Sequence, residues 1–156
     1  MSICNCRPIE YSSAKIGMYV ILKSRPCKVT HHVTSKTGKH GSMKVSMMGN
    51  DVLTGKKYEV AGAGHMVTYQ FDVDRKSYQI LSLENNILSC LDDSCNQIEF
   101  NFSNDHQLFE ELNNKLKGNV DIYVTIVTAP IPTQNVGENA GEFTDEYFVE
   151  SYKLCD

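Results

Sequence analysis

The stretch CKVTHHVTSKTGKHGSMKVSM, residues 27–47, decides the fold of the first half of the chain. Every second residue on either side of its polar centre shares one character, first Cys27, Val29, His31 and Val33, then Met43, Val45 and Met47. This period of two is typical of half-buried strands. Two such strands joined by a short polar connector with glycines predict a hairpin whose loop projects from a sheet.

The residues around this hairpin predict further short strands. Residues 16–22 form an apolar run followed by a turn at residues 23–26. Turn-forming residues at 50–51 and 54–55 lead to another strand around residues 58–60. Several short antiparallel strands without a convincing helix favour a small barrel for this half.

The second half begins after a glycine-rich break at residues 61–64 and changes its pattern once. Strands are predicted at residues 66–74, 78–83, 87–91, 98–102 and 120–126. Between the last two, Leu108, Leu112 and Leu116 share one helical face, with Gly118 as the end of the helix and Ser103, Asn104 or Asp105 as its N-cap. Strands, one helix and a closing strand are the order of an oligonucleotide/oligosaccharide-binding (OB) barrel. The fold class expected is therefore mainly all-β.

The segment from residue 130 to residue 156 is polar and acidic until Tyr147, Phe148 and Val149. Such a composition buries little apolar surface, so we expect a disordered acidic extension with at most a short terminal helix.

The net charge of −4 hides an asymmetry between the two halves. Residues 1–70 hold ten Lys and Arg against three acids, a net +7, whereas residues 71–156 hold five against sixteen, a net −11. This division predicts two domains with different partners, the basic one facing a polyanion. Absence of a 20-residue apolar run and of a signal-peptide core indicates a cytoplasmic protein.

Candidate catalytic and metal-binding patterns are weak. Gly38 and Lys39 do not belong to a Walker loop, because Val33 and His40 occupy two positions that the motif fixes. Adjacent His31 and His32 point to opposite faces of a strand, which favours ordinary strand histidines over metal ligands. The six cysteines lack CxxC spacing, so we expect reduced thiols rather than zinc ligands. The sequence thus predicts no enzyme active site.

The basic loop has two readings on composition alone. It is either a solvated hairpin tip or a tip whose lysines contact phosphates. Gly38 and Gly41 flank Lys39 and His40, and glycines permit positive φ and the close approach of another macromolecule. The arrangement suits a lysine that reaches, or is reached by, a partner.

These residues also carry a family resemblance. The string TSKTGKHG at residues 34–41, preceded by RPCK at 25–28 and followed by DVLTGKKY at 51–58, resembles the eukaryotic and archaeal translation factor 5A family, relatives of bacterial elongation factor P. The close match covers residues 15 to 60. The second half resembles the family in element order and in the residues LS at 88–89 and LDDS at 91–94. From residue 130 onward we find no match.

The resemblance implies a fold with two domains and a specific modification. It implies an SH3-like barrel over residues 1–70 that carries the loop, an OB domain over residues 71–129, and leaves residues 130–156 as the acidic extension. It implies that deoxyhypusine synthase and then deoxyhypusine hydroxylase convert Lys39 to hypusine. The modification loop would comprise Lys36, Thr37, Gly38, His40 and Gly41 around it. The NAD of the first step belongs to the synthase, so no cofactor is expected here.

The resemblance also implies a partner and a role. Members bind the ribosome beside peptidyl-tRNA and promote peptide-bond formation at proline-rich sequences and termination. Sequence-independent RNA contacts are then expected from five lysines of the basic half, namely Lys28, Lys36, Lys44, Lys56 and Lys57. The alternative is an RNA-binding or interaction paralogue without the modification. Many members continue the loop as HGHAK, whereas Ser42 and Met43 stand here in place of the second His and the Ala.

Overall fold

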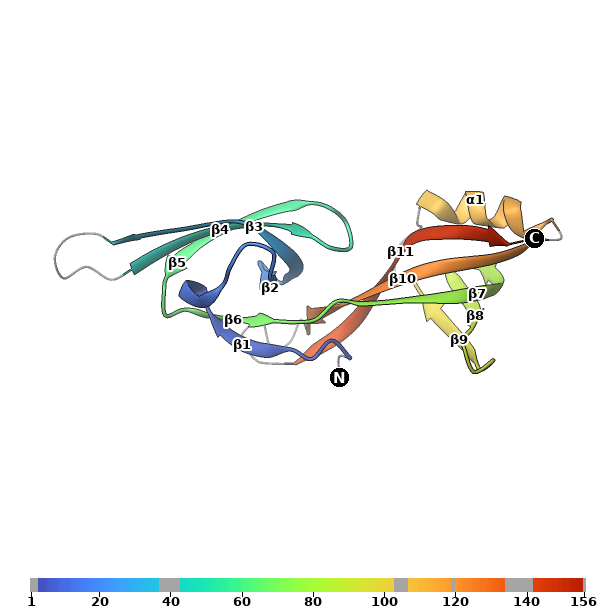
Figure 1. Ribbon diagram of the computed structural model, residues 1–156, viewed down its shortest axis with the longest axis horizontal. Helices are drawn as coiled ribbons and strands as arrows, with labels where there is room; N and C mark the ends of the chain where they lie inside the picture. The colour runs from blue at the N-terminus through green and yellow to red at the C-terminus, as the bar shows by residue number, and fades with distance from the viewer. Residues whose placement is uncertain (1–2, 37–42, 103–106, 119, 134–141, 156) are drawn as a thin grey trace. The chain divides into compact units, whose positions relative to one another are not determined.

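The computed structural model describes residues 3–36, 43–102, 107–118, 120–133 and 142–155. These residues form two antiparallel sheets and one α-helix, which confirms the mainly all-β class (Figure 1). None of the helices in these ranges combines the length and the apolar character needed to cross a membrane.

The first sheet contains six strands in the order β1-β6-β2-β3-β4-β5. A 3-10 helix, η1 (Tyr11–Ser13), follows the first of them. The strands are β1 (Arg7–Glu10), β2 (Tyr19–Leu22), β3 (Arg25–Lys36), β4 (Met43–Asp51), β5 (Lys57–Ala63) and β6 (Val67–Gln70). The predicted hairpin is confirmed as the β3–β4 pair, with Lys36 opposite Met43 at its described end.

The core of the first unit uses the predicted alternation only up to a β-bulge. Cys27 and Val29 of β3 are buried, as are Val45 and Met47 of β4. The register shifts between Val29 and His31, and a bulge of this kind moves the residues beyond it to the other face. Val33, expected beside Val29, is therefore 61% exposed. The full cluster contains Tyr11, Ala14, Val20, Leu22, Cys27, Val29, Val45 and Met47.

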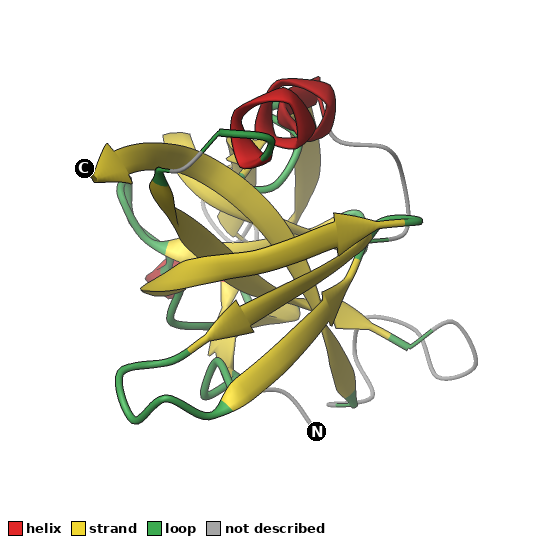
Figure 2. Cartoon of the chain, turned by 90° about the vertical axis from the view of Figure 1, so that its right-hand side faces the viewer, coloured by secondary structure: helices red, strands yellow, loops and turns green. Residues whose placement is uncertain are grey.

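The second sheet contains five strands in the order β11-β10-β7-β8-β9. These are β7 (Asp74–Glu84), β8 (Ile87–Leu91), β9 (Gln97–Asn101), β10 (Asp121–Pro132) and β11 (Phe143–Cys155). The predicted helix is confirmed as α1 (Gln107–Leu116), drawn in red in Figure 2. Phe109 and Leu112 of α1 are buried, and the Phe109 ring packs edge-on against Phe102 with centroids 5.0 Å apart. The proposed N-cap residues 103–105 lie outside the described ranges.

The prediction of a disordered C-terminal extension is wrong. Residues 143–155 form β11, which pairs with β10 at the edge of the second sheet. Val149 is fully buried, and the Tyr147 ring packs edge-on against Phe100 with centroids 5.0 Å apart. A few apolar side chains of β11 that pack against neighbouring strands are enough for pairing, even though the average composition of the segment is polar.

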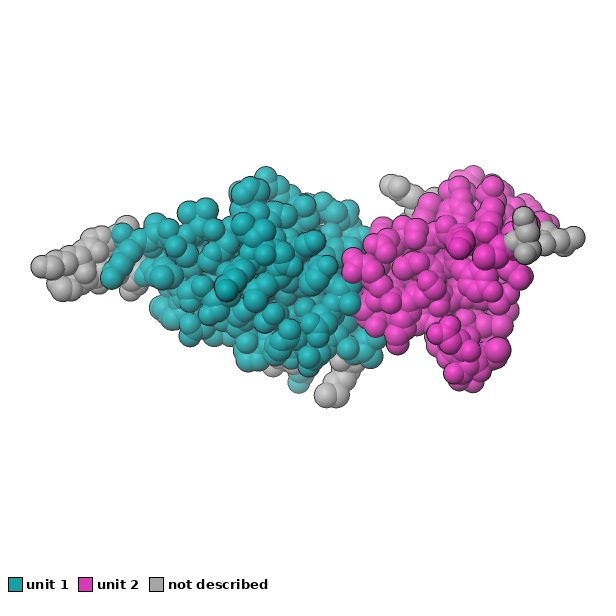
Figure 3. Space-filling view, viewed as in Figure 1, with its two compact units in different colours: residues 1–73, 129–145 teal, residues 74–128, 146–156 magenta. Residues whose placement is uncertain are grey.

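The chain divides into two compact units, coloured separately in Figure 3. Unit 1 comprises residues 1–73 and 129–145, and unit 2 comprises residues 74–128 and 146–156. Residues 130–156 are thus divided between the units rather than forming a separate extension. The predicted strand over residues 66–74 does not open the second half either. Its ordered part, β6, pairs with β1 and β2 of the first sheet.

Two core thiols give the protein a pH dependence at the alkaline end. Burial, followed by the neighbouring Asp51 carboxylate, raises the pKa of Cys27 to about 12, and burial alone raises the pKa of Cys90 to about 12. The folded state therefore keeps both thiols protonated where the unfolded chain ionises them. Their contribution to stability is complete below about pH 9 and is lost as the pH rises toward 12.

We expect the free energy of unfolding to fall less steeply above pH 9 in the variant Cys27→Ala/Cys90→Ala than in the wild type, because the variant lacks the two thiols whose pKa burial raises. Urea denaturation at a series of pH values measures these slopes. The exposed Cys95 supplies the control, since Cys95→Ala should keep the wild-type slope. Equal slopes in all three proteins would contradict the assignment.

Candidate functional site

The β3–β4 hairpin carries the candidate site. β3 and β4 run side by side, and beyond the bulge after Val29 their ladder pairs Ser35 with Lys44 and Lys36 with Met43 (Figure 1). On its other edge β4 pairs with β5, where Lys44 faces Ala63. Lys36, Met43 and Lys44 are exposed. The residues linked by this hairpin end are 37–42, so the predicted modification site Lys39 and its neighbours Thr37, Gly38, His40 and Gly41 lie outside the described residues.

Hydrogen bonds from η1 brace the hairpin at its first strand. The Nε2 of His32 in β3 lies 2.8 Å from the carbonyl oxygen of Tyr11. A carbonyl only accepts, so this ring nitrogen carries the proton and donates it. The N–H of Tyr11 in turn donates to the Met66 carbonyl at 2.8 Å. His32 is therefore a structural histidine of the strand, as the sequence favoured.

Gly64 joins the same brace to the start of β4. Its N–H donates to the carbonyl of Met43 at 2.9 Å, and its own carbonyl accepts from the N–H of Ser12 at 3.1 Å. A Cβ at Gly64 would lie 3.3 Å from Met43 Sδ and from Ser12 Cβ. The glycine-rich stretch predicted as a break is instead the end of β5 and a close backbone approach. Gly64 thereby holds the backbone of Met43, the residue at which β4 begins after the loop.

We expect His32→Ala to lower the free energy of unfolding by about 1 kcal/mol, because it removes one hydrogen bond and leaves the Tyr11 carbonyl without its side-chain donor. Thermal unfolding followed by circular dichroism measures the loss. The neighbouring His31 is exposed, so His31→Ala should change stability by less than about 0.5 kcal/mol. A larger loss for His31 than for His32 would contradict this account of the brace.

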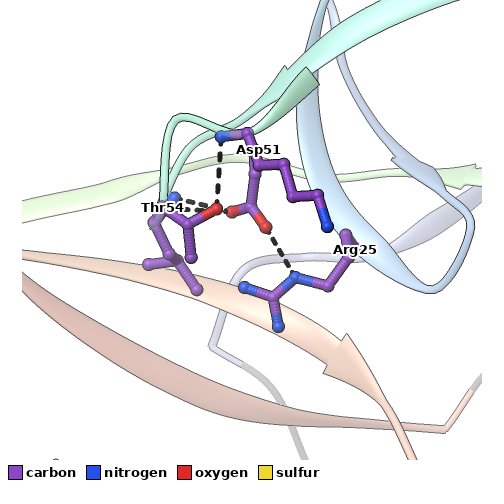
Figure 4. Close-up of polar contacts among 5 residues, drawn as sticks. Arg25, Asp51 and Thr54 are labelled. Carbon is purple, nitrogen blue, oxygen red and sulfur yellow. Dashed lines mark hydrogen bonds and ion pairs between the residues drawn. The ribbon is translucent and has the colours of Figure 1, made fainter. Parts of the chain in front are cut away.

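The other end of β4 is organised by the carboxylate of Asp51. Among the residues that the structure describes, Asp51 is the only charged one in the buried class, and its side chain is fully covered. Its Oδ2 accepts a hydrogen bond from Arg25 Nε at 2.6 Å (Figure 4). Its Oδ1 accepts from the N–H groups of Leu53 at 2.8 Å and Thr54 at 3.3 Å. Burial of a carboxylate is unfavourable unless hydrogen-bond donors satisfy its oxygens, as these three do.

The backbone of Asp51 closes the same turn. Its N–H donates to the Lys56 carbonyl and its carbonyl accepts from the N–H of Gly55, both at 2.8 Å. Gly55 has φ +79, a conformation that glycine adopts most easily. The N–H of Val52 donates to the Pro26 carbonyl at 2.9 Å, which ties the turn to the start of β3. The DVLTGKKY string of the sequence is therefore a turn built around one carboxylate.

Asp51→Ala should lower the free energy of unfolding by about 3 kcal/mol, because it removes the carboxylate that accepts hydrogen bonds from the Arg25 guanidinium and from two backbone N–H groups. Urea denaturation followed by circular dichroism measures this. The matched control is Asp72→Ala, which breaks an ion pair of 3.3 Å to Arg7 whose side chains are 62% and 41% exposed. Such a surface pair contributes at most about 1 kcal/mol. Similar losses in both variants would contradict the central role of Asp51.

The five lysines predicted to contact RNA fall into two groups rather than one. Lys36 and Lys44 lie at the loop end of the hairpin. Lys28 and Lys57 both oppose Asn50 on β4, so they form one row across β3, β4 and β5 on the same face of the sheet. At about 3.3 Å per residue, Asn50 lies roughly 20 Å along β4 from Lys44.

The second lysine group is larger than the sequence indicated. Lys56 and Lys57 line a pocket of about 440 Å³ together with Lys23. Lys23 lies in the turn between β2 and β3, which was predicted as a turn without a functional role. Its basic side chain at a tight turn was the available signal. Lys28 and Lys56 each hold their Nζ over a tyrosine ring, 6.0 Å from Tyr19 and 5.5 Å from Tyr58 respectively.

The described residues contain no cluster of side chains suited to binding a metal ion. Within residues 3–36, 43–102, 107–118, 120–133 and 142–155, no group of three or more His, Cys, Asp or Glu is arranged to hold a metal ion. The described residues therefore suit contact with the surface of a partner. Hydrogen bonds brace the hairpin near its loop, and lysines cluster at the other end of β4.

Two small β domains, the first carrying a basic hairpin, define the class of protein. The sequence profile of the family "Translation initiation factor 5A-like, N-terminal" matches residues 4–65. The chain is 32% identical over 123 residues to eukaryotic translation initiation factor 5A of Dictyostelium discoideum, which covers 78% of this chain and 77% of the relative. The chain therefore belongs to the translation initiation factor 5A family.

Solved structures agree with this assignment. A translation initiation factor 5A family protein from Naegleria fowleri superimposes with a TM-score of 0.69 at 25% identity, covering 96% of this chain and 99% of that one. Eukaryotic translation initiation factor 5A from Methanococcus jannaschii shares the fold, with a TM-score of 0.59, 18% identity and 98% coverage of each chain. The expected SH3-like barrel followed by an OB fold is thereby confirmed.

Proposed function

We propose that this chain is a hypusine-containing translation factor that binds the ribosome beside peptidyl-tRNA. In this proposal it promotes peptide-bond formation at proline-rich stalling sequences and supports termination. Membership of the factor 5A family, together with the uninterrupted TSKTGKHG string at residues 34–41, is the observation that carries the proposal. The chain acts as a factor and not as a classical enzyme.

The proposed acceptor is Lys39. Deoxyhypusine synthase would attach an aminobutyl group from spermidine to its ε-amine, and deoxyhypusine hydroxylase would complete hypusine. The added length and second amine extend the reach of the side chain toward RNA near the peptidyl-transferase centre. Holding substrates in a reactive geometry is an effective way to accelerate a reaction between two molecules. The hydrogen bonds that brace the hairpin near its loop support this role, because a loop that positions a substrate must be held by rigid neighbouring strands.

The basic character of the first unit supports a ribosomal partner. In the proposal, Lys28, Lys36, Lys44, Lys56 and Lys57 supply phosphate contacts that do not read sequence. All five are exposed. Lys44 and the row of Lys28 and Lys57 lie on one face of the sheet, roughly 20 Å apart along β4, which suits a partner that spans this face rather than a mononucleotide. Lys36, opposite Met43, lies on the other face.

Ser42 and Met43 distinguish this loop from members that continue as HGHAK. The described Met43 is exposed and meets the brace through its carbonyl, which any residue provides. The substitution therefore alters the side chains offered to the modifying enzymes more than the foundation of the loop.

Mass spectrometry of the loop peptide, isolated from the natural host during growth, tests the proposal directly. We expect Lys39 to carry the aminobutyl addition, with or without the hydroxyl, and Lys36 and Lys44 of the same region to remain unmodified. A wholly unmodified Lys39 would favour the alternative, an RNA-binding or interaction paralogue that kept the loop alone.

Lys39→Arg should reduce synthesis through proline runs by about tenfold or more, because arginine keeps the positive charge but cannot accept the aminobutyl group. A reporter with a proline run, translated in extracts depleted of the natural factor, measures the effect. Lys36→Arg is the matched control and should retain most activity. Undiminished synthesis with Lys39→Arg would count against the mechanism.

A further inference from the structure

Three lysines from two places in the chain line one pocket in the first unit. Lys23 comes from the turn between β2 and β3, Lys56 from the turn between β4 and β5, and Lys57 from the start of β5. Tyr58 and Glu59 complete the lining of the pocket, whose volume is about 440 Å³. Three positive side chains against one carboxylate leave an excess of positive charge, which favours an anion.

Lys23 occupies a backbone conformation that lysine does not prefer. Lys23 and Ser24 have φ of +50 and +63, and they form the two-residue loop between the paired residues Leu22 and Arg25. Turns with two positive φ values favour Asn, Asp and Gly. A lysine in the left-handed region is strained, because its Cβ comes too close to the following carbonyl oxygen. Local strain of this kind tends to persist where the side chain serves a function.

Lys56 and Lys57 are held by the network of Asp51. The carbonyl of Lys56 accepts from the Asp51 N–H at 2.8 Å, and Lys57 begins β5 opposite Asn50. The Nζ of Lys56 lies 5.5 Å from the centroid of the Tyr58 ring, a contact that restrains a long side chain. Since Asp51 is neutralised by Arg25, its buried charge does not cancel the field of the lysines.

The composition of the pocket distinguishes between two classes of polyanion. Protein interfaces are depleted in lysine and enriched in aromatic residues and arginine at their centres. Nucleic-acid interfaces are far more positively charged, and lysine contacts phosphate as a point charge without reading bases. Here three exposed lysines line the pocket and its lining contains no arginine. An RNA backbone therefore fits the pocket better than an acidic protein.

We propose that Lys23, Lys56 and Lys57 form a phosphate-binding pocket that holds an RNA backbone whether or not Lys39 is modified. The proposal rests on the proposed function in one respect, namely that the RNA would belong to the ribosome. The pocket lies at the opposite end of the β4–β5 ladder from the modification loop. The pocket that binds the RNA backbone and the loop that carries Lys39 therefore act at two separate ends of the same sheet.

Fluorescence anisotropy with the unmodified full chain and a labelled RNA hairpin of mixed sequence tests the pocket. The variant is Lys23→Asn/Lys57→Gln, in which Asn suits the positive φ at residue 23, so the fold should be at least as stable. Between about 50 and 200 mM salt, the slope of log K against log[salt] should decrease in magnitude by about 1.5, the sum of two lost phosphate contacts. At the low end of this range, affinity should fall about tenfold.

The control carries the same charge change in the second unit. Lys117→Gln/Lys153→Gln removes two exposed lysines that lie outside the pocket and should keep the wild-type slope. Equal losses in both variants, or equal binding of polyglutamate and RNA by the wild type, would overturn the proposal. Failure of the unmodified wild type to bind RNA at about 50 mM salt would overturn it too, while leaving the modification of Lys39 to be decided by mass spectrometry.

Discussion

The buried carboxylate of Asp51 is the interaction on which the first unit depends most. A charge removed from water is unfavourable unless its lone pairs are satisfied, and here one guanidinium and two backbone N–H groups satisfy them. The donors come from the start of β3 and from the turn into β5, so one side chain fixes how three strands meet. Because the pair is neutral as a unit, the surrounding lysines keep their outward field.

The opposite end of β4 is held by a different kind of interaction. There the structure uses backbone hydrogen bonds through η1, Gly64 and the carbonyl of Met43, with His32 as the side-chain donor. The continuous ladder of β4 with β3 and β5 connects the two ends. In the proposed function, a sheet fixed at both ends is a suitable carrier for a loop that presents one lysine to a large partner.

Several features could be predicted from sequence because they follow from local rules. The period of two around residues 27–47 gave the hairpin, and the spacing of Leu108, Leu112 and Leu116 gave α1. The loop string also indicated the family, because an uninterrupted motif depends on residue identity and not on packing. A turn was anticipated at residues 23–26, although its restriction to Lys23 and Ser24 and its convergence with Lys56 and Lys57 were not.

Other features were decided only by contacts distant in sequence. The bulge after Val29 exposes Val33, and nothing in the alternating pattern of β3 announces a bulge. β6 was assigned to the second half, yet it pairs with β1 and β2, since strand pairing is a choice between edges that local residues do not encode. The polar C-terminal segment forms β11 because it pairs with the neighbouring strand β10 and because its Val149 is buried in the core of the second unit.

The sequence by itself determined which residues are available for chemistry: one lysine between Gly38 and His40, a basic half and an acidic half. These follow from residue identity and order. The tertiary structure decided which lysines lie together, because Lys23 and Lys57 lie far apart in the chain and meet only through the pairing of β2, β3, β4 and β5. It also decided that Asp51 is buried, since its covering comes from Arg25 and from backbone that folding brings to it.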